Sequence, residues 1–186
     1  MDLDRLTIEL GRTLTLFGLV ALVGCQINPD DAPVVWYVQS AASPNAAPGI
    51  GTREAPFRSL ATVSAAAGAG HEIHVLAREP GAPILDGGIV LRDSQVLRAA
   101  DGEGPRPVLT NKDPDHHGGD AVTLANGSGG DGITISGAAG HAVVGTNVQG
   151  ALVRHTRITG GNLAGLTSVT TGATAGLGVA AFPKAL

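Results

Sequence analysis

Ile133-Thr134-Ile135-Ser136-Gly137 recurs as Thr156-Arg157-Ile158-Thr159-Gly160 at an offset of 23 in the numbering. Ala121-Val122 likewise recurs as Ala142-Val143 at an offset of 21, and Ala164 follows Ala142 at an offset of 22. A repeat of about 20 to 50 residues is typical of proteins that stack one supersecondary unit on the next. A unit of this size has room for three short strands and their turns. The repeat therefore predicts stacked coils of strands.

The composition agrees with such a chain, since 28 of its 186 residues are glycine and only 3% are aromatic. Glycine tolerates positive φ, so it suits the sharp turns between short strands. We predict strands near 88–92, 95–99, 107–111, 120–125, 132–136, 141–145 and 151–159. In the last of these, Val153 and Ile158 differ in parity, so a bend must separate them if both point inward.

The segment ahead of the repeats predicts a cap. Residues 36–38 (Trp-Tyr-Val) are β-prone, and residues 41–52 form a loop rich in Ala, Pro and Gly. Pro56 suits the first turn of a helix, and Gly68 and Gly70 would end it. Its predicted face has helical spacing and consists of Phe57, Leu60, Ala61 and Ser64. Residues 73–77 then alternate as a strand.

These motifs resemble the N-terminal segment of right-handed parallel β-helix proteins of the pectin-lyase-like superfamily. There an extended Tyr-Val segment, a Gly-rich loop, an A-P-F-x-S-L motif, an Ala-rich capping helix and a G-D-x-I strand follow one another. This chain has APFRSL at 55–60 and GHEI at 70–73, with His71 in place of the Asp. The resemblance covers residues 36–170 and implies an all-β fold, a right-handed parallel β-helix of about three coils under an N-terminal capping helix. An irregular Gly-rich β-sandwich is the alternative.

The N-terminus predicts a lipid anchor. Residues 14–23 are apolar and too few to span a bilayer, which needs about 20, so they predict the helix of a secretory signal. The sequence Leu22-Val23-Gly24-Cys25 resembles the lipobox of bacterial lipoproteins, which implies that Cys25, the only cysteine, carries a diacylglycerol thioether. Gln26 in the next position implies the outer rather than the inner membrane. The region before the apolar run is net negative, which departs from the usual positive start.

The predicted organisation has five parts. They are a signal peptide (1–24), a tether (25–35), an N-terminal cap (36–77), β-helix coils (78–170) and an atypical tail (171–186). The tail shows no amphipathic cap, so we expect the chain to be truncated there. The alternative is a short β-helix that pairs with another chain at its C-terminal end.

One polar loop is a weak candidate for metal binding, and it contains Asp113, Asp115, His116, His117 and Asp120. Carboxylates suit Ca²⁺, and imidazoles with carboxylates suit transition metals. The Asp-Pro and Gly-Gly pairs of the loop are equally typical of a solvated turn. No metal site is therefore assigned, and Ca²⁺ remains the ion to consider.

No catalytic constellation emerges. In polysaccharide lyases of the superfamily an Arg or Lys acts as base beside Ca²⁺-binding aspartates, which draws attention to Arg154 and Arg157. Asp131 lies one repeat earlier, but we predict it in a turn before Ile133, away from a matching strand. Whether the chain is an enzyme stays open.

The remaining titratable groups suggest no site either. His141 and His155 are well separated in the sequence and are predicted to end strands without forming a pair. Asp86 and Asp93 have no partner at the spacing of a glycosidase carboxylate pair. Between Phe57 and Phe182 there is no aromatic residue, so the coils offer no stacking platform for sugars.

The predicted function is a structural or binding role in the cell envelope. With 12 Lys and Arg against 16 Asp and Glu, the net charge of −4 gives no basic footprint for nucleic acid. The expected partners are the membrane, through the acyl anchor, and a polysaccharide or another envelope protein. The alternative is the N-terminal fragment of a carbohydrate-active β-helix enzyme, a polysaccharide lyase or a glycoside hydrolase.

Overall fold

The computed structural model describes residues 32–43, 45–100, 105–161 and 166–169. The predicted signal peptide, the lipobox with Cys25, most of the tether and the tail (171–186) lie outside the described residues. One compact unit begins at Pro33. Within the described part, no helix combines the length and the apolar character needed to cross a membrane.

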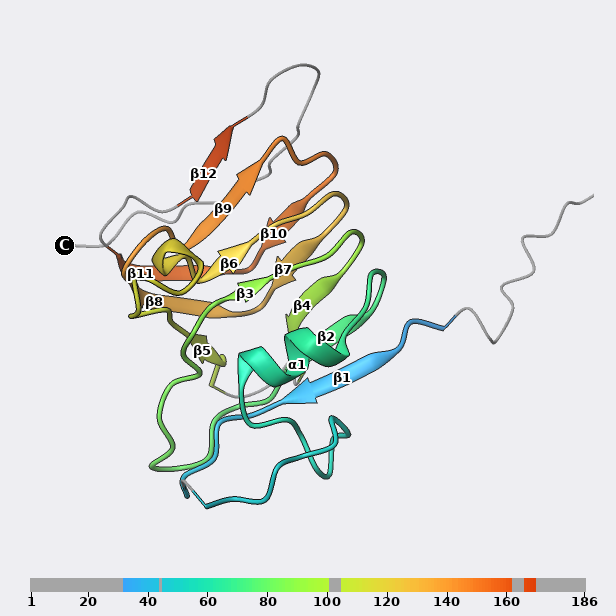
Figure 1. Ribbon diagram of the computed structural model, residues 1–186, viewed down its shortest axis with the longest axis vertical. Coiled ribbons are helices and arrows are strands. Elements are labelled where there is room, and N and C mark those ends of the chain that lie inside the picture. Colours follow the sequence, from blue (N-terminus) through green and yellow to red (C-terminus); the bar gives the residue numbers. More distant parts are fainter. Residues whose placement is uncertain (1–31, 44, 101–104, 162–165, 170–186) are drawn as a thin grey trace, which may run out of the picture. The chain divides into compact units, whose positions relative to one another are not determined.

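The described residues form mostly strands, with one α-helix and one short 3-10 turn, so the predicted all-β class is confirmed (Figure 1). In chain order the elements are β1 (Val35–Val38), α1 (Leu60–Ala66), β2 (Glu72–Val75), β3 (Ile89–Val90), β4 (Val96–Ala99), β5 (Val108–Leu109), η2 (His117–Gly119), β6 (Val122–Thr123), β7 (Gly129–Asp131), β8 (Thr134–Ala138), β9 (Val143–Thr146), β10 (Leu152–Arg154), β11 (Arg157–Gly161) and β12 (Leu166–Val169).

The strands form three sheets in which every pairing is parallel. Their strand orders are β1-β2-β4-β7-β10, β11-β8-β5 and β12-β9-β6-β3. Consecutive strands β7, β8 and β9 fall in three different sheets, and β10, β11 and β12 pair with them in the same order (Figure 1). A chain that visits three sheets in turn and then returns to the first repeats its structure along one direction.

The sequence repeat is the structural repeat. Ile158 pairs with Ile135 and Val143 with Val122, as the offsets of 23 and 21 predict. The offset of 22 predicted from Ala142 to Ala164 was wrong by one residue, because Val143 pairs with Leu166 at an offset of 23. The strand that contains Leu166 was not predicted.

Two turns separate consecutive strands. The predicted strand 132–136 corresponds to β8 with its bounds shifted by two residues, whereas β7 was not predicted. Gly132 turns the chain between them with φ 72°. One repeat later, His155 has φ 50° between β10 and β11, so the bend expected between Val153 and Ile158 is confirmed.

The helix α1 is shorter than predicted. It begins at Leu60 instead of Pro56, because Ser59 is its N-cap and accepts a hydrogen bond from the Thr62 amide at 3.2 Å. Phe57 lies before the helix in extended backbone, bridged to Val38. The predicted face was therefore partly wrong, since Ala61 is exposed and Ser64 half-buried. The buried helix side chains are Leu60 and Val63.

The core consists of aliphatic side chains that stack from strand to strand. In the five-stranded sheet one inward row contains Trp36, Ile73, Leu97, Gly130 and Val153 as register partners. Ile73 and Leu97 are fully buried, and the two end residues pack against the same core. Because side chains alternate between the two faces of a strand, the residues before and after this row point outward and form two further rows.

Candidate functional site

One outward row of the five-stranded sheet carries a polar side chain on each of the five strands. It comprises Tyr37, His74, Arg98, Asp131 and Arg154, which are register partners on β1, β2, β4, β7 and β10; we call this row the polar ladder. Neighbouring strands lie about 4.8 Å apart, so the ladder extends over about 19 Å. Aromatic, basic and acidic groups are thereby held in a fixed order on one rigid face.

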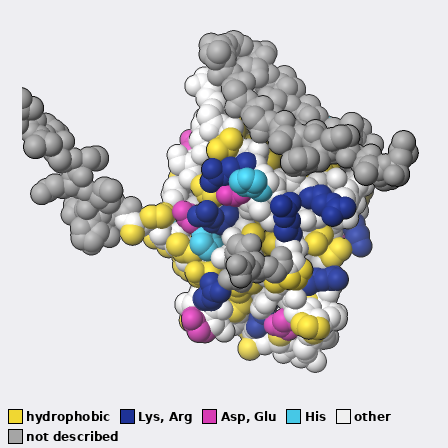
Figure 2. Space-filling model, turned by 180° about the vertical axis from the view of Figure 1, so that it is seen from behind, with side chains coloured by type: hydrophobic (Ala, Val, Ile, Leu, Met, Phe, Trp, Pro, Cys, Tyr) yellow, Lys and Arg dark blue, Asp and Glu magenta, His cyan; other side chains and the backbone are white. Residues whose placement is uncertain are grey.

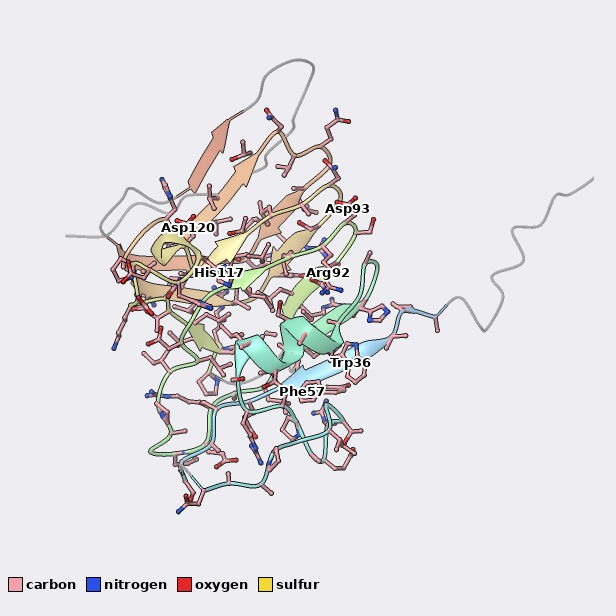
Figure 3. The ribbon with its side chains drawn as sticks, viewed as in Figure 1. Trp36, Phe57, Arg92, Asp93, His117 and Asp120 are labelled. Atoms are coloured by element: carbon pink, nitrogen blue, oxygen red, sulfur yellow. The ribbon has the colours of Figure 1, made fainter. Side chains whose placement is uncertain are left out.

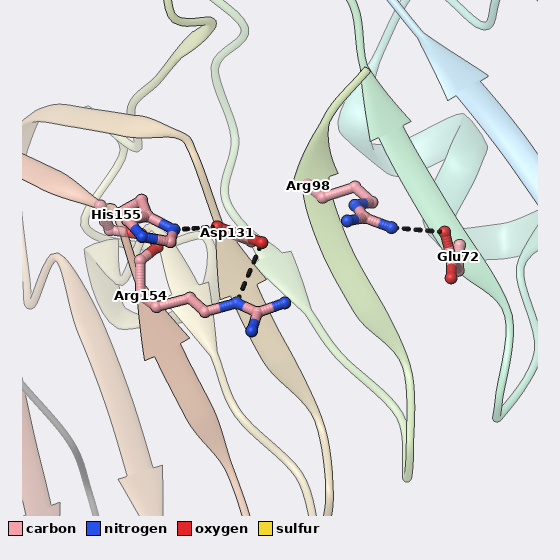
Figure 4. Close-up of polar contacts among 6 residues, drawn as sticks. Glu72, Arg98, Asp131, Arg154 and His155 are labelled. Carbon is pink, nitrogen blue, oxygen red and sulfur yellow. Dashed lines mark hydrogen bonds and ion pairs between the residues drawn. The ribbon is translucent and has the colours of Figure 1, made fainter. Parts of the chain in front are cut away.

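The first half of the polar ladder is organised by Glu72. His74 Nε2 donates to Glu72 Oε2 at 2.7 Å. Arg98 Nη1 donates to the same oxygen at 3.3 Å (Figure 4). The hydrogen bond from His74 lowers the pKa of the Glu72 carboxyl against the opposing effect of burial, and Arg98 lowers it further. Glu72 therefore stays ionised and holds both basic side chains in place.

The second half is organised by Asp131. Arg154 Nε donates to Asp131 Oδ2 at 3.0 Å, and His155 Nδ1 donates to Asp131 Oδ1 at 2.8 Å (Figure 4). Burial alone would raise the pKa of the Asp131 carboxyl, but the hydrogen bonds from His155 and Arg154 outweigh it and lower that pKa. The predicted turn position of Asp131 was wrong, because this residue ends β7 in register with Arg154.

An aromatic ring ends the polar ladder. Tyr37 meets His74 edge to face with ring centroids 5.3 Å apart. The guanidinium of Arg53 lies over the Tyr37 ring, 5.9 Å from its centroid. Edge-to-face and cation–π contacts of this kind fix ring orientation. The ladder thus begins with an aromatic ring that already contacts His74 and Arg53.

The acidic side chains of this site are less exposed to solvent than the arginine side chains. The side chains of Asp131 and Glu72 are 19% and 22% exposed, whereas those of Arg98 and Arg154 are 39% and 54% exposed. The carboxylates therefore lie at the base and the guanidinium groups stand outside them. The rear view shows basic, acidic and histidine side chains gathered on one face (Figure 2). Arg98 and Arg154 each use one nitrogen toward their carboxylate, and within the described part of the chain their other N–H groups make no hydrogen bond.

The candidate metal loop is not assembled into a site. Asp113 Oδ1 accepts from the Asp115 amide at 2.9 Å, which closes a turn. The ring of His116 donates to the Gly87 carbonyl and packs 4.0 Å from that of His117. Asp120 Oδ1 instead accepts from His141, through the backbone amide at 2.7 Å and the ring Nδ1 at 2.9 Å.

Asp120 and His117 lie on the same turn, distant from Trp36 and Phe57 of the cap (Figure 3). Among the residues that the structure describes, no three His, Cys, Asp or Glu side chains are placed to hold a metal ion. The polar groups of the loop thus bind one another and also Gly87 and His141 outside it.

The other predicted residues serve structure. Arg157 lies on β11 in a different sheet, opposite Thr134. Asp86 Oδ1 accepts from the amides of Gly87 and Lys112. Asp93 Oδ1 accepts from the Asn126 amide in the next turn of the stack. Arg92, beside it, donates to the Ser64 carbonyl of the helix at 3.4 Å (Figure 3).

Most of the polar ladder escaped the sequence reasoning. The alternation in β2 (EIHV) and β4 (VLRA) places His74 and Arg98 on the outward face, but their alignment depends on register. From His74 onward, the offset from one member of the ladder to the next is 24, then 33, then 23. The middle offset is long because the segments from β4 to β5 and from β5 to β6 contain more residues than the corresponding segments from β7 to β8 and from β8 to β9.

No protein-family model, curated protein or solved structure matches this chain. The resemblance to the pectin-lyase-like superfamily therefore depends on the motifs at 55–60 and 70–73. His71, which replaces the usual Asp there, accepts at Nδ1 from Trp36 Nε1 at 3.0 Å and from the Gly68 amide at 2.9 Å. In this chain that position ties the first strand to the turn after the helix.

Proposed function

We propose that this chain is a lipid-anchored protein of the bacterial cell envelope, built as a right-handed parallel β-helix with a binding role. Three parallel sheets visited in turn, with register offsets of 21 and 23, support the β-helix. The helix α1 at the start of the stack supports the capping role that the resemblance implies. The lipobox ending at Cys25 supports the anchor.

The polar ladder is the observation that carries the binding role. Its five residues lie in one row across five strands, so an extended ligand laid across the strands would meet them in succession. Two ion-pair networks hold this row, although the core of the chain needs no charge there. Exposed, pre-oriented polar side chains on a rigid scaffold are typical of binding sites.

The ligand that this row fits best is an acidic polysaccharide. Arg98 and Arg154 are two strands apart, so their outward guanidinium groups recur at about 10 Å. Guanidinium groups bind carboxylates and sulfates through paired N–H donors. Glu72 and Asp131 are already neutralised by their partners and oppose the anion less than free carboxylates would.

Binding is tested by isothermal titration with polygalacturonate at low salt. Arg98→Ala and Arg154→Ala should each weaken binding by roughly tenfold, since each removes a charge-assisted contact. Arg157→Ala is the matched control, because Arg157 is exposed on another sheet. Equal losses in all three variants would show only general charge attraction, and the proposed role of the ladder would then be wrong.

The anchor is tested separately. Mass spectrometry of the protein purified from membranes should show an acylated Cys25 as the first residue, and Cys25→Ala should abolish acylation. Retention of the lipid mass on the Ala variant would contradict the proposal. A single acyl chain binds membranes weakly, whereas two or more give stable anchoring. Membrane association should therefore be lost when Cys25→Ala abolishes the modification.

A carbohydrate-active enzyme is the second candidate. The pairing of Asp131 with Arg154 on adjacent strands favours it, because a strand position for that carboxylate was the missing element of a lyase-like arrangement. The purified protein should then release unsaturated ends from polyuronate in the presence of Ca²⁺. Binding without release would support the non-catalytic role.

A further inference from the structure

Each carboxylate of the polar ladder binds one histidine as well as one arginine. At Asp131, His155 Nδ1 donates to Oδ1 at 2.8 Å, while Arg154 donates to the other oxygen (Figure 4). The His155 side chain is 70% exposed, and its Nε2 makes no hydrogen bond to the described residues. Arg157, at the start of β11, is the next cation along the chain. A proton can therefore reach Nε2 from solvent while the contact with Asp131 is kept.

His74 is arranged in the same way at the other carboxylate. Its Nε2 donates to Glu72 Oε2 at 2.7 Å, and its Nδ1 makes no hydrogen bond within the described part of the chain, so Nδ1 can take up a proton. Arg98 donates to the same Glu72 oxygen from β4. On the side of β1, Tyr37 meets the imidazole edge to face, and the guanidinium of Arg53 lies over the Tyr37 ring.

The net charge of the ladder and its partners depends on these two rings. The two ladder arginines contribute +2 and the two carboxylates −2, so their sum is zero while both imidazoles are neutral. The hydrogen bond from His74 lowers the pKa of the Glu72 carboxyl. At Asp131, burial raises the pKa less than the hydrogen bonds from His155 and Arg154 lower it. The carboxylates therefore stay ionised between about pH 5 and 8, the range in which histidine ordinarily changes charge.

We propose that the polar ladder binds acidic polysaccharides more tightly as the pH falls from about 8 to about 5.5, and that His74 and His155 take up the protons. Protonation of both rings changes the summed charge from zero to +2. An anion laid along the row is then attracted by four cationic side chains in place of two. Because coupling between two ligands is reciprocal, binding of the polysaccharide must itself favour proton uptake. This regulation depends on the binding role proposed above for the ladder.

The test is isothermal titration at low salt with polygalacturonate, and with dextran sulfate as a second probe, at about pH 5.5 and about pH 8. Carboxylates titrate near pH 4 and sulfate esters lower still, so the charge of either probe changes little in this range. The affinity should be roughly five- to tenfold higher at the lower pH, since two cations are added at partly exposed positions. Titration of the unaltered protein in two buffers of different ionisation enthalpy should show net proton uptake on binding.

The double substitution His74→Gln and His155→Gln removes both protonation sites but leaves an amide donor for each carboxylate. Its affinities at the two pH values should therefore be equal. His117→Gln is the matched control, because His117 is exposed on η2, outside the five-stranded sheet. This control should keep the pH dependence of the unaltered protein.

Three results would overturn the proposal while leaving the binding role intact. They are binding of equal strength at both pH values, pH dependence that persists in the double variant, and a loss of pH dependence in His117→Gln as large as in His155→Gln. The last result would assign the effect to the overall charge of the protein. Failure of both probes to bind at either pH would instead refute the binding role of the ladder, and its regulation with it.

Discussion

Arg154 and Asp131 are register partners on β10 and β7, and their side chains meet at 3.0 Å across the outward face of the sheet. Parallel register thus brings two residues from successive repeats into a direct ion pair. His155, which follows Arg154, binds the other oxygen of the same carboxylate. One acidic side chain therefore fixes two exposed basic groups at the end of the polar ladder.

The first prediction concerns the pH dependence of stability. The pKa of Asp131 is lowered in the folded state, so its deprotonated form is favoured by folding. Its contribution is fully present above the unfolded pKa of about 4 and is lost as pH falls below that value toward the folded pKa. Asp131→Asn should remove this contribution and flatten the stability profile below about pH 4.

The measurement is urea unfolding as a function of pH in both proteins. At neutral pH the variant should be less stable by about 1 kcal/mol or less, because its partners are largely solvent-exposed. The pKa of Glu72 is also lowered in the folded state, so its contribution to stability is likewise lost as pH falls. Part of the loss of stability at acid pH should therefore remain in the Asp131→Asn variant. Identical profiles for the two proteins would show that Asp131 is not paired in solution.

The second prediction tests the register of β7 against β10 with two adjacent glycines. A Cβ built on Gly129 would overlap the carbonyl oxygen of Leu152, whereas one built on Gly130 meets Ile133 Cδ1 at an ordinary 3.7 Å. Gly129→Ala should therefore cost about 1–3 kcal/mol of stability. Gly130→Ala should be neutral or stabilise by about 0.4–1 kcal/mol, since it restricts the unfolded chain.

Thermal or urea unfolding of the two variants gives the comparison directly. The substitution is the same, the strand is the same, and only the facing atoms differ. A reversed order of stability would mean that the strands pair in a register shifted by one residue, which exchanges the inward and outward faces.

The third prediction tests the stacking of repeats through two isoleucines in one column. Ile135 and Ile158 are register partners, but Ile135 is fully buried and Ile158 is 37% exposed on the outermost described strand of its sheet. Ile135→Ala should cost about 2–5 kcal/mol, as expected for a buried aliphatic side chain. Ile158→Ala should cost about 1–2 kcal/mol, because less apolar surface leaves water. Equal costs in unfolding experiments would show that further chain covers Ile158.

The repeat and the all-β class could be predicted from the sequence because they depend on local alternation and on offsets of 21 and 23 in the C-terminal half of the stack. The polar ladder could not, because its members are aligned only after the insertion between β4 and β7 is placed correctly. The start of the helix was misjudged for a related reason. Pro56 permits a helical first turn, but Phe57 gains more from its contacts with Val38 and Trp36 in extended backbone.

Single turn residues also show how far the sequence alone can predict the structure. Glycine at 132 predicts a turn, whereas the equivalent position one repeat later is occupied by His155, and positive φ is uncommon for any residue other than glycine. Only the structure shows that this histidine hydrogen-bonds to Asp131. Residues held in a disfavoured backbone conformation are often retained for the contacts they make.

The last prediction therefore concerns His155→Gly. Glycine removes the backbone strain, about 1 kcal/mol, while the exposed hydrogen bond that is lost contributes about as much or less. Stability should be unchanged or slightly raised, yet the pKa of Asp131 should rise toward its ordinary value because one of its donors is gone. NMR titration of the Asp131 carboxyl measures this separately from unfolding. Ser94→Gly is the control, since Ser94 also has positive φ, at 58°, but its backbone amide binds Asn126. A shift of the Asp131 pKa in both variants would mean that backbone relaxation, rather than the imidazole, sets it.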